Sequence, residues 1–131
     1  MWDDFVIPYW NQMYEGLCNG EKRFVHVENL APEHLKYLKK ARIAHYQPSV
    51  SEKITLDNIK VNLDPDITYD WLLYSYRITE MTDKQIEDWV DKTVNAGVSI
   101  IRTQMGAFTH HRNKLDRIVV FFKAFEKYRT F

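Results

Sequence analysis

Three short segments of the chain alternate polar and apolar side chains, and their polar residues could form a site. Residues 23–28, 43–50 and 98–104 have the composition of strands. Because side chains alternate between the two faces of a strand, the polar groups of each segment share a face. These groups are His26 and Glu28 in the first segment, His45, Gln47 and Ser49 in the second, and Arg102 and Gln104 in the third. Any one could be an ordinary polar group at the rim, but as a set they predict a pocket.

A fourth segment, residues 67–77, is rich in Tyr, Trp and Leu and is also predicted to be a strand. Its alternation leaves two choices open. Either Tyr74 and Tyr76 or Ser75 and Arg77 could point with the polar set. Of these residues, Tyr76 is taken as a candidate substrate-binding residue.

Helical patterns separate the predicted strands. Phe5, Tyr9, Met13 and Leu17 stand four residues apart and mark one face of a first helix, which begins near Ile7. The clearest later helix begins at Thr82, which forms a capping box with Gln85, and it is closed by Gly97. Further helices are predicted over 31–40, 55–62 and 113–128.

The predicted order of elements is αβαβαβαβα, which favours a parallel sheet covered by helices. Two architectures fit this order: an open doubly wound sheet, or four βα units of an eight-unit barrel. The glycine fingerprints of nucleotide-binding folds are missing from the sequence. The polar set lies near the carboxyl ends of the strands, where such folds bind ligands.

Composition limits the class of protein. The chain has 131 residues, with 18 Lys and Arg against 18 Asp and Glu, so we expect a single domain over 1–131 and no nucleic-acid partner. One cysteine excludes an internal disulfide and favours a reducing, cytoplasmic setting. The longest apolar run, residues 118–122, is too short to cross a membrane, and the N-terminus lacks the basic region of a signal peptide.

Several stretches carry a family resemblance through their order and spacing. They are Pro8-Tyr9 before the first helix, FVHVENL at 24–30, TDKQ at 82–85, AGVSIIRTQMG at 96–106, Asn113, and FEKY at 125–128. In this arrangement the chain resembles the C-terminal half of the uroporphyrinogen decarboxylase superfamily. The resemblance implies four sequential βα units that form half of a TIM (β/α)8 barrel. The superfamily contains decarboxylases of tetrapyrrole acetates and corrinoid-dependent methyltransferases.

The resemblance also implies roles for residues at the first and last strands. In the methyltransferase branch, a His-x-Cys on the first strand and a Cys-Gly after the last bind zinc, which lowers the pKa of a substrate thiol. This chain has His26-x-Glu28 and Met105-Gly106 at those places. Zinc accepts imidazole and carboxylate, so His26 and Glu28 are the expected metal-binding and catalytic pair. In the decarboxylase branch a His precedes that glycine, and Met105 departs from that pattern too.

Two functions from different classes follow. In the first, the chain moves a methyl group between a corrinoid on a partner protein and an acceptor or donor. The expected substrate-binding residues are Gln47, Tyr76, Arg102 and Gln104, with Arg102 fixing an anionic group. In the second, the chain is a non-catalytic half-barrel subunit or ligand-binding module. A decarboxylase of the same superfamily is a further alternative, and bound metal would favour the enzymatic function.

The resemblance to half of a barrel also predicts a partner. A full barrel has about 250 residues, whereas this chain has 131. Four sequential strands leave two unpaired edges and an open inner face, which favour association with another chain. We therefore expect either a complementary N-terminal half-barrel chain, which catalysis would need, or a homo-oligomer.

Overall fold

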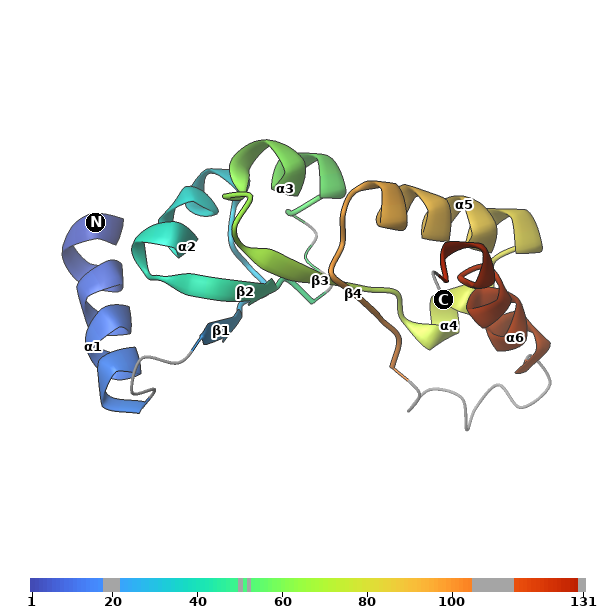
Figure 1. The fold of residues 1–131 in the computed structure, drawn as a ribbon, viewed down its shortest axis with the longest axis horizontal. Coiled ribbons are helices and arrows are strands. Elements are labelled where there is room, and N and C mark those ends of the chain that lie inside the picture. The colour runs from blue at the N-terminus through green and yellow to red at the C-terminus, as the bar shows by residue number, and fades with distance from the viewer. Residues whose placement is uncertain (18–21, 50, 52, 105–114, 130–131) are drawn as a thin grey trace. The chain divides into compact units, whose positions relative to one another are not determined.

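The structure is a computed structural model that describes residues 1–17, 22–49, 51, 53–104 and 115–129 (Figure 1). The chain divides into two compact units, Met1–Trp71 and Leu72–Phe131, which are described one after the other. The single cysteine, Cys18, and three residues of the family resemblance, Met105, Gly106 and Asn113, lie outside the described residues, as do parts of the segments predicted over 43–50 and 113–128.

The fold is α/β with four parallel strands, as the sequence predicts. The strands are β1 (Arg23–His26), β2 (Ile43–Gln47), β3 (Thr68–Leu72) and β4 (Ile100–Arg102), and they follow the order β1-β2-β3-β4. The pairs β1–β2 and β2–β3 are parallel. Beside β4, within the second unit, the Leu73 N–H donates to the Arg102 carbonyl oxygen at 3.0 Å.

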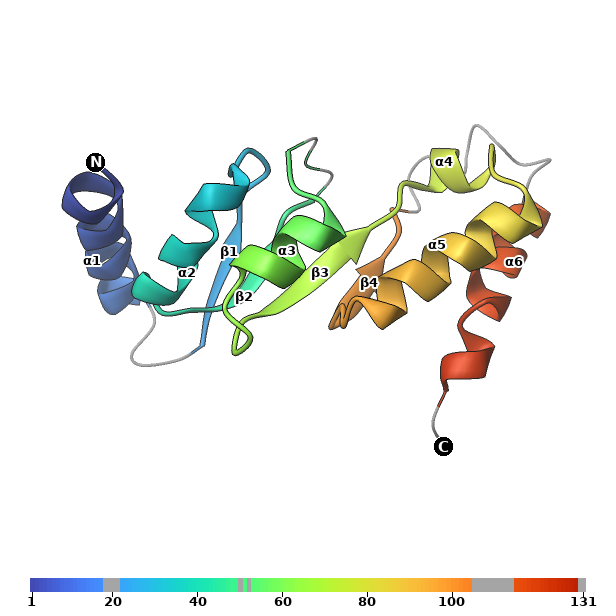
Figure 2. The same ribbon diagram turned by 90° about the horizontal axis from the view of Figure 1, so that it is seen from above.

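In the first unit, helices cover one face of the sheet. Its helical elements are the π-helical turn η1 (Trp2–Val6), α1 (Ile7–Leu17), the 3-10 turn η2 (Pro32–His34), α2 (Lys36–Lys40) and α3 (Leu56–Asn62). Figures 1 and 2 show α2 and α3 on the same side of β1, β2 and β3. Leu35, Leu38 and Ile59 are buried under them with Tyr46 of β2. The opposite face of these strands carries the polar residues.

Polar and aromatic contacts attach the N-terminal helix to this unit. The Trp2 ring stacks on His34 and Tyr37, with centroids 4.7 and 5.2 Å away. The buried Arg23 guanidinium donates to Asn11 Oδ1 at 2.5 Å and to the Ala41 carbonyl oxygen at 2.8 Å. A buried cation needs such partners, and here they tie α1 to β1 and to the end of α2.

The second unit contains α4 (Ser75–Ile78), α5 (Asp83–Asn95), α6 (Leu115–Lys123) and the 3-10 turn η5 (Glu126–Tyr128). The predicted capping box is confirmed, since the Gln85 N–H donates to Thr82 Oγ1 and the Thr82 N–H donates to Gln85 Oε1. Gly97 closes α5 with a φ of 78°, as predicted. The core of the unit consists of Leu73, Ile78, Ile86, Val90, Ile118, Phe121 and Ala124.

One predicted strand is wrong over its second half. The strand expected over 67–77 ends at Leu72, and α4 begins at Ser75. The Ile78 N–H donates to the Tyr74 carbonyl oxygen, which closes a helical turn and places the Ile78 side chain in the core. Burial of Ile78 therefore overrides the strand propensity of the aromatic residues around it.

The last predicted helix, over 113–128, does not bury all of its large apolar residues. Ile118, Phe121 and Ala124 are buried, whereas Val119 and Phe122 are largely exposed. The apolar row that runs through η1 and α1, from Phe5 to Leu17, is exposed as well. Among the described residues, none of the helices has both the length and the apolar character of a membrane span.

Candidate functional site

A buried carboxylate lies at the centre of the polar face of the first unit. His45 in β2 pairs with Thr68 in β3, and its Nε2 lies 2.7 Å from Asp70 Oδ1. The Asp70 side chain is 1% exposed and that of His45 is 17% exposed. Gln47 Nε2 donates to the other carboxylate oxygen, Oδ2, at 3.2 Å. Two neighbours on β2 thus satisfy a carboxylate from β3, as burial of a charge requires.

The second nitrogen of His45 is also engaged. His45 Nδ1 lies 2.7 Å from Thr68 Oγ1, and that hydroxyl donates to the Ala44 carbonyl oxygen at 3.1 Å. Both ring nitrogens thus lie within hydrogen-bond distance of side chains on β3. His45 therefore orients this network and has no nitrogen left for a metal ion.

The sequence indicated His45 for this face but missed Asp70 and Thr68. The strand predicted over 67–77 leaves the assignment of its two faces open. The available signal was the alternation of Thr68 and Asp70, which repeats that of His45 and Gln47 on the neighbouring strand. On the other side of His45, the Phe24 ring is stacked at 5.3 Å between centroids.

His26, Glu28 and Gln47 come together at the carboxyl ends of β1 and β2. His26 ends β1, Gln47 ends β2, and their Cα atoms are partners in the sheet register. His26 Nε2 lies 3.6 Å from Glu28 Oε1, with the two side chains 48% and 54% exposed. In β1, Arg23 and Val25 are buried, whereas His26 is exposed, so the predicted alternation of faces in this strand is confirmed. These residues are accessible to a ligand from solution.

The other predicted site residues lie in the second unit. Tyr76 is on α4, where its ring stacks on Tyr74 at 5.3 Å between centroids. Arg102 is the last residue of β4, and Gln104 follows two residues later, both exposed. Their convergence with His26, Glu28 and Gln47 on one ligand stays a prediction.

The described residues do not fit a zinc centre. Zinc sites use three or four protein ligands, whereas His26 and Glu28 supply two. Within the described ranges, no group of three or more His, Cys, Asp or Glu side chains is arranged to hold a metal ion. We therefore derive no catalytic step through zinc.

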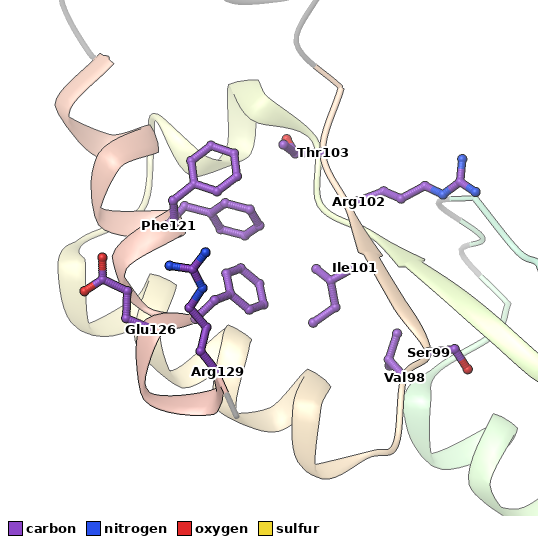
Figure 3. A pocket seen from close by; sticks show the side chains of 10 residues that line it. Val98, Ser99, Ile101, Arg102, Thr103, Phe121, Glu126 and Arg129 are labelled. Atoms are coloured by element: carbon purple, nitrogen blue, oxygen red, sulfur yellow. The ribbon is translucent and has the colours of Figure 1, made fainter. Parts of the chain in front are cut away.

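The second unit has an apolar groove of about 820 Å³ beside β4 (Figure 3). Its lining residues are Val98, Ser99, Ile101, Arg102, Thr103, Phe121, Phe122, Phe125, Glu126 and Arg129. Figure 3 shows Ile101 pointing toward the phenylalanine rings and Arg102 extending to the other side of the strand, as the sequence predicts for this pair. Arg129 carries its guanidinium alongside the rings, and Glu126 points away from them.

Searches against family models, curated proteins and solved structures find no match to this chain.

Proposed function

We propose that this chain is the substrate-binding half-barrel of a uroporphyrinogen decarboxylase-like protein that serves a corrinoid-dependent methyl transfer system in the cytoplasm. The observation that carries the proposal is the meeting of His26, Glu28 and Gln47 at the carboxyl ends of β1 and β2. Ligands bind at this end of the strands in parallel α/β folds. The family resemblance of the sequence supplies the reaction class, and this geometry supplies a place for the polar substrate.

The residues at this place suit an acceptor that must lose a proton. A thiol that takes a methyl group on its sulfur releases its proton, and a positioned base accelerates that step. His26 would accept the proton through its imidazole, and the Glu28 carboxylate beside it would stabilise the imidazolium. The Gln47 amide oxygen would accept a hydrogen bond from the substrate, while its nitrogen stays on Asp70. The corrinoid, carried by a partner protein, would supply the methyl group.

One observation favours a second function, a module that binds a polar ligand without catalysis. Among the described residues, His26 and Glu28 are two potential metal ligands, and no third ligand is arranged beside them. Both ring nitrogens of His45 have hydrogen-bond partners within the fold. A face whose His45 and Gln47 are hydrogen-bonded to Asp70 can still present His26, Glu28 and Gln47 to a ligand. Binding without turnover would be its signature.

Consumption of methylcobalamin in the presence of thioglycolate, followed by absorbance, tests the methyl transfer function. The full chain should accelerate the reaction over the free thiol, and His26→Ala and Glu28→Gln should each lower the rate about tenfold or more. Glu33→Gln changes an exposed glutamate on η2 and should leave the rate unchanged.

The outcomes separate the two functions. Failure of the wild-type chain to accelerate the reaction contradicts methyl transfer by this chain without a complementary half-barrel. Chemical-shift changes at His26, Glu28 and Gln47 during a thioglycolate titration would then support the binding module, and their absence would reject this site. Equilibrium dialysis with zinc completes the test. Stoichiometric zinc that is lost in His26→Ala would show that further ligands come from outside the described residues.

A further inference from the structure

The side-chain amide of Gln47 has a defined orientation on the polar face. Its Nε2 donates to Asp70 Oδ2 at 3.2 Å, and the Asp70 side chain is 1% exposed. Because a carboxylate only accepts hydrogen bonds, the amide nitrogen rather than the amide oxygen faces Asp70. The oxygen, Oε1, is therefore the group that Gln47 offers to a ligand at the end of β2, beside the end of β1.

The neighbouring group on β1 also accepts hydrogen bonds. The Glu28 side chain is 54% exposed, and its two carboxylate oxygens are acceptors only. His26 Nε2 lies 3.6 Å from Glu28 Oε1, which is longer than a hydrogen bond, so His26 leaves the lone pairs of Glu28 to a ligand. Glu28 and Gln47 thus present acceptors on the two strands, with the His26 imidazole between them in the chain order of the site.

The charged groups of this face favour a cation. Among its described residues, Glu28 and Asp70 supply carboxylates, and none is Lys or Arg. The basic residues in the described part of the first unit lie at the amino ends of β1 and β2 (Lys22, Arg23, Arg42), on α2 and α3 across the sheet (Lys36, Lys39, Lys40, Lys60) and after β2 (Lys53). Lys53, in the segment that leads from β2 to α3, is therefore the cation whose influence needs a control.

We propose that this site takes a small thiol that bears an ammonium group, in preference to a thiol that bears a carboxylate. An ammonium group has three N–H donors, which suit the Glu28 carboxylate and Gln47 Oε1, and its charge strengthens both hydrogen bonds. A ligand carboxylate would instead bring a like charge to Glu28 and no donor to Gln47. The thiol rests on the proposed function, whereas the charge preference follows from the side chains of the face. Arg102, the candidate for an anionic group, lies in the second unit and plays no part in this preference.

Three thiols that differ only in their terminal group test the preference. Cysteamine carries an ammonium, mercaptoethanol a hydroxyl and β-mercaptopropionate a carboxylate. Each is titrated into the full chain at neutral pH, and its dissociation constant is taken from the chemical-shift changes at His26, Glu28 and Gln47. Cysteamine should bind about threefold more tightly than mercaptoethanol, and β-mercaptopropionate about threefold more weakly, which is the effect of one exposed charge pair.

Matched variants assign the preference to Glu28. Glu28→Gln keeps the size of the side chain and removes its charge, so the three dissociation constants should come within about twofold of one another. Glu33→Gln removes the charge of an exposed glutamate on η2, and Lys53→Gln removes the cation after β2. Both controls should keep the order of the three thiols. All three side chains are exposed, so each variant should retain the wild-type circular dichroism spectrum.

Three results would overturn the proposal: equal affinity for the three thiols, tightest binding of β-mercaptopropionate, or an order that survives in Glu28→Gln. Tightest binding of β-mercaptopropionate would indicate that a cation such as Arg102 reaches the ligand. The titration needs no turnover, so its outcome is separate from that of the proposed function. The predicted order without methyl transfer would support the ligand class and reject the reaction, and methyl transfer without the order would do the reverse.

Discussion

At the residue scale, the Asp70 carboxylate is held by hydrogen bonds to His45 and Gln47 and is 1% exposed. The His26–Glu28 pair on the same face is about half exposed. Removal of a hydrogen-bond partner from a buried carboxylate costs more than removal of one from an exposed pair, which water screens. The two histidines therefore differ in their contribution to stability, although both belong to the polar face.

We expect His45→Ala to lower the free energy of unfolding by about 1–3 kcal/mol, because the buried Asp70 carboxylate loses one of its hydrogen-bond partners. His26→Ala is the control and should cost less than about 1 kcal/mol. Urea unfolding measures both. Similar small losses in the two variants would show that Asp70 does not depend on His45.

Tyr46, on the opposite face of β2, predicts a response to alkali. Its side chain is fully buried, its hydroxyl donates to the Val27 carbonyl oxygen at 3.2 Å, and burial raises its pKa above the ordinary value of 10.0. The folded state therefore binds the phenolic proton more tightly than the unfolded state. The resulting stability is present below pH 10 and falls as the pH rises above it.

Tyr46→Phe should lose about 1 kcal/mol at neutral pH, since one hydrogen bond is removed, and its stability should decline less steeply above pH 10 than that of the wild type. Some decline should persist, because burial also raises the pKa of Tyr69. Urea unfolding at several alkaline pH values gives the comparison. Tyr9→Phe, at an exposed position, should follow the wild type, and identical alkaline slopes for all three proteins would contradict the prediction.

At the element scale, α5 has both ends fixed by local chemistry. Thr82 and Gln85 satisfy free backbone donors at its start, and Gly97 adopts a φ of 78° just after its end. Its last turns are further tied to η5, where the Tyr128 hydroxyl donates to Asp91 at 2.8 Å. The hydrogen bonds from Lys127 and Tyr128 hold the pKa of Asp91 below its ordinary value.

Two glycine substitutions separate backbone strain from packing. An added Cβ meets nothing within 4 Å at either Gly16 or Gly97. Gly97→Ala should therefore cost about 1 kcal/mol purely through its positive φ, whereas Gly16→Ala in α1 should stabilise by about 0.5–1 kcal/mol. Thermal unfolding measures both, and a change of the same sign in the two variants would contradict this interpretation.

At the scale of the whole molecule, the chain is neutral overall but its charges are unevenly distributed. The carboxylates of segment 1–17 are paired within the chain: Asp3 with Lys40, Asp4 with the N-terminal amine and Glu15 with Arg42. These pairs are exposed and screened by salt, so each should contribute little to stability.

The sequence by itself determined the features that depend on neighbouring residues. The alternation of Val25 and His26 assigned the faces of β1, and the Thr82–Gln85 spacing with Gly97 located the ends of α5. The α/β order of elements followed from these local periods, because each helix or strand imposes its own spacing on buried side chains.

Only the tertiary structure decided which residues meet across strands and which apolar faces are covered. Asp70 reaches His45 and Gln47 through the register of β3 against β2, which neither segment encodes alone. Ser75 begins a helix because Ile78 is buried in the core of the second unit. The apolar row from Phe5 to Leu17 stays exposed, although its four-residue spacing is typical of a buried helix face. Burial depends on residues distant in the sequence, so local spacing predicts an apolar face without showing what covers it.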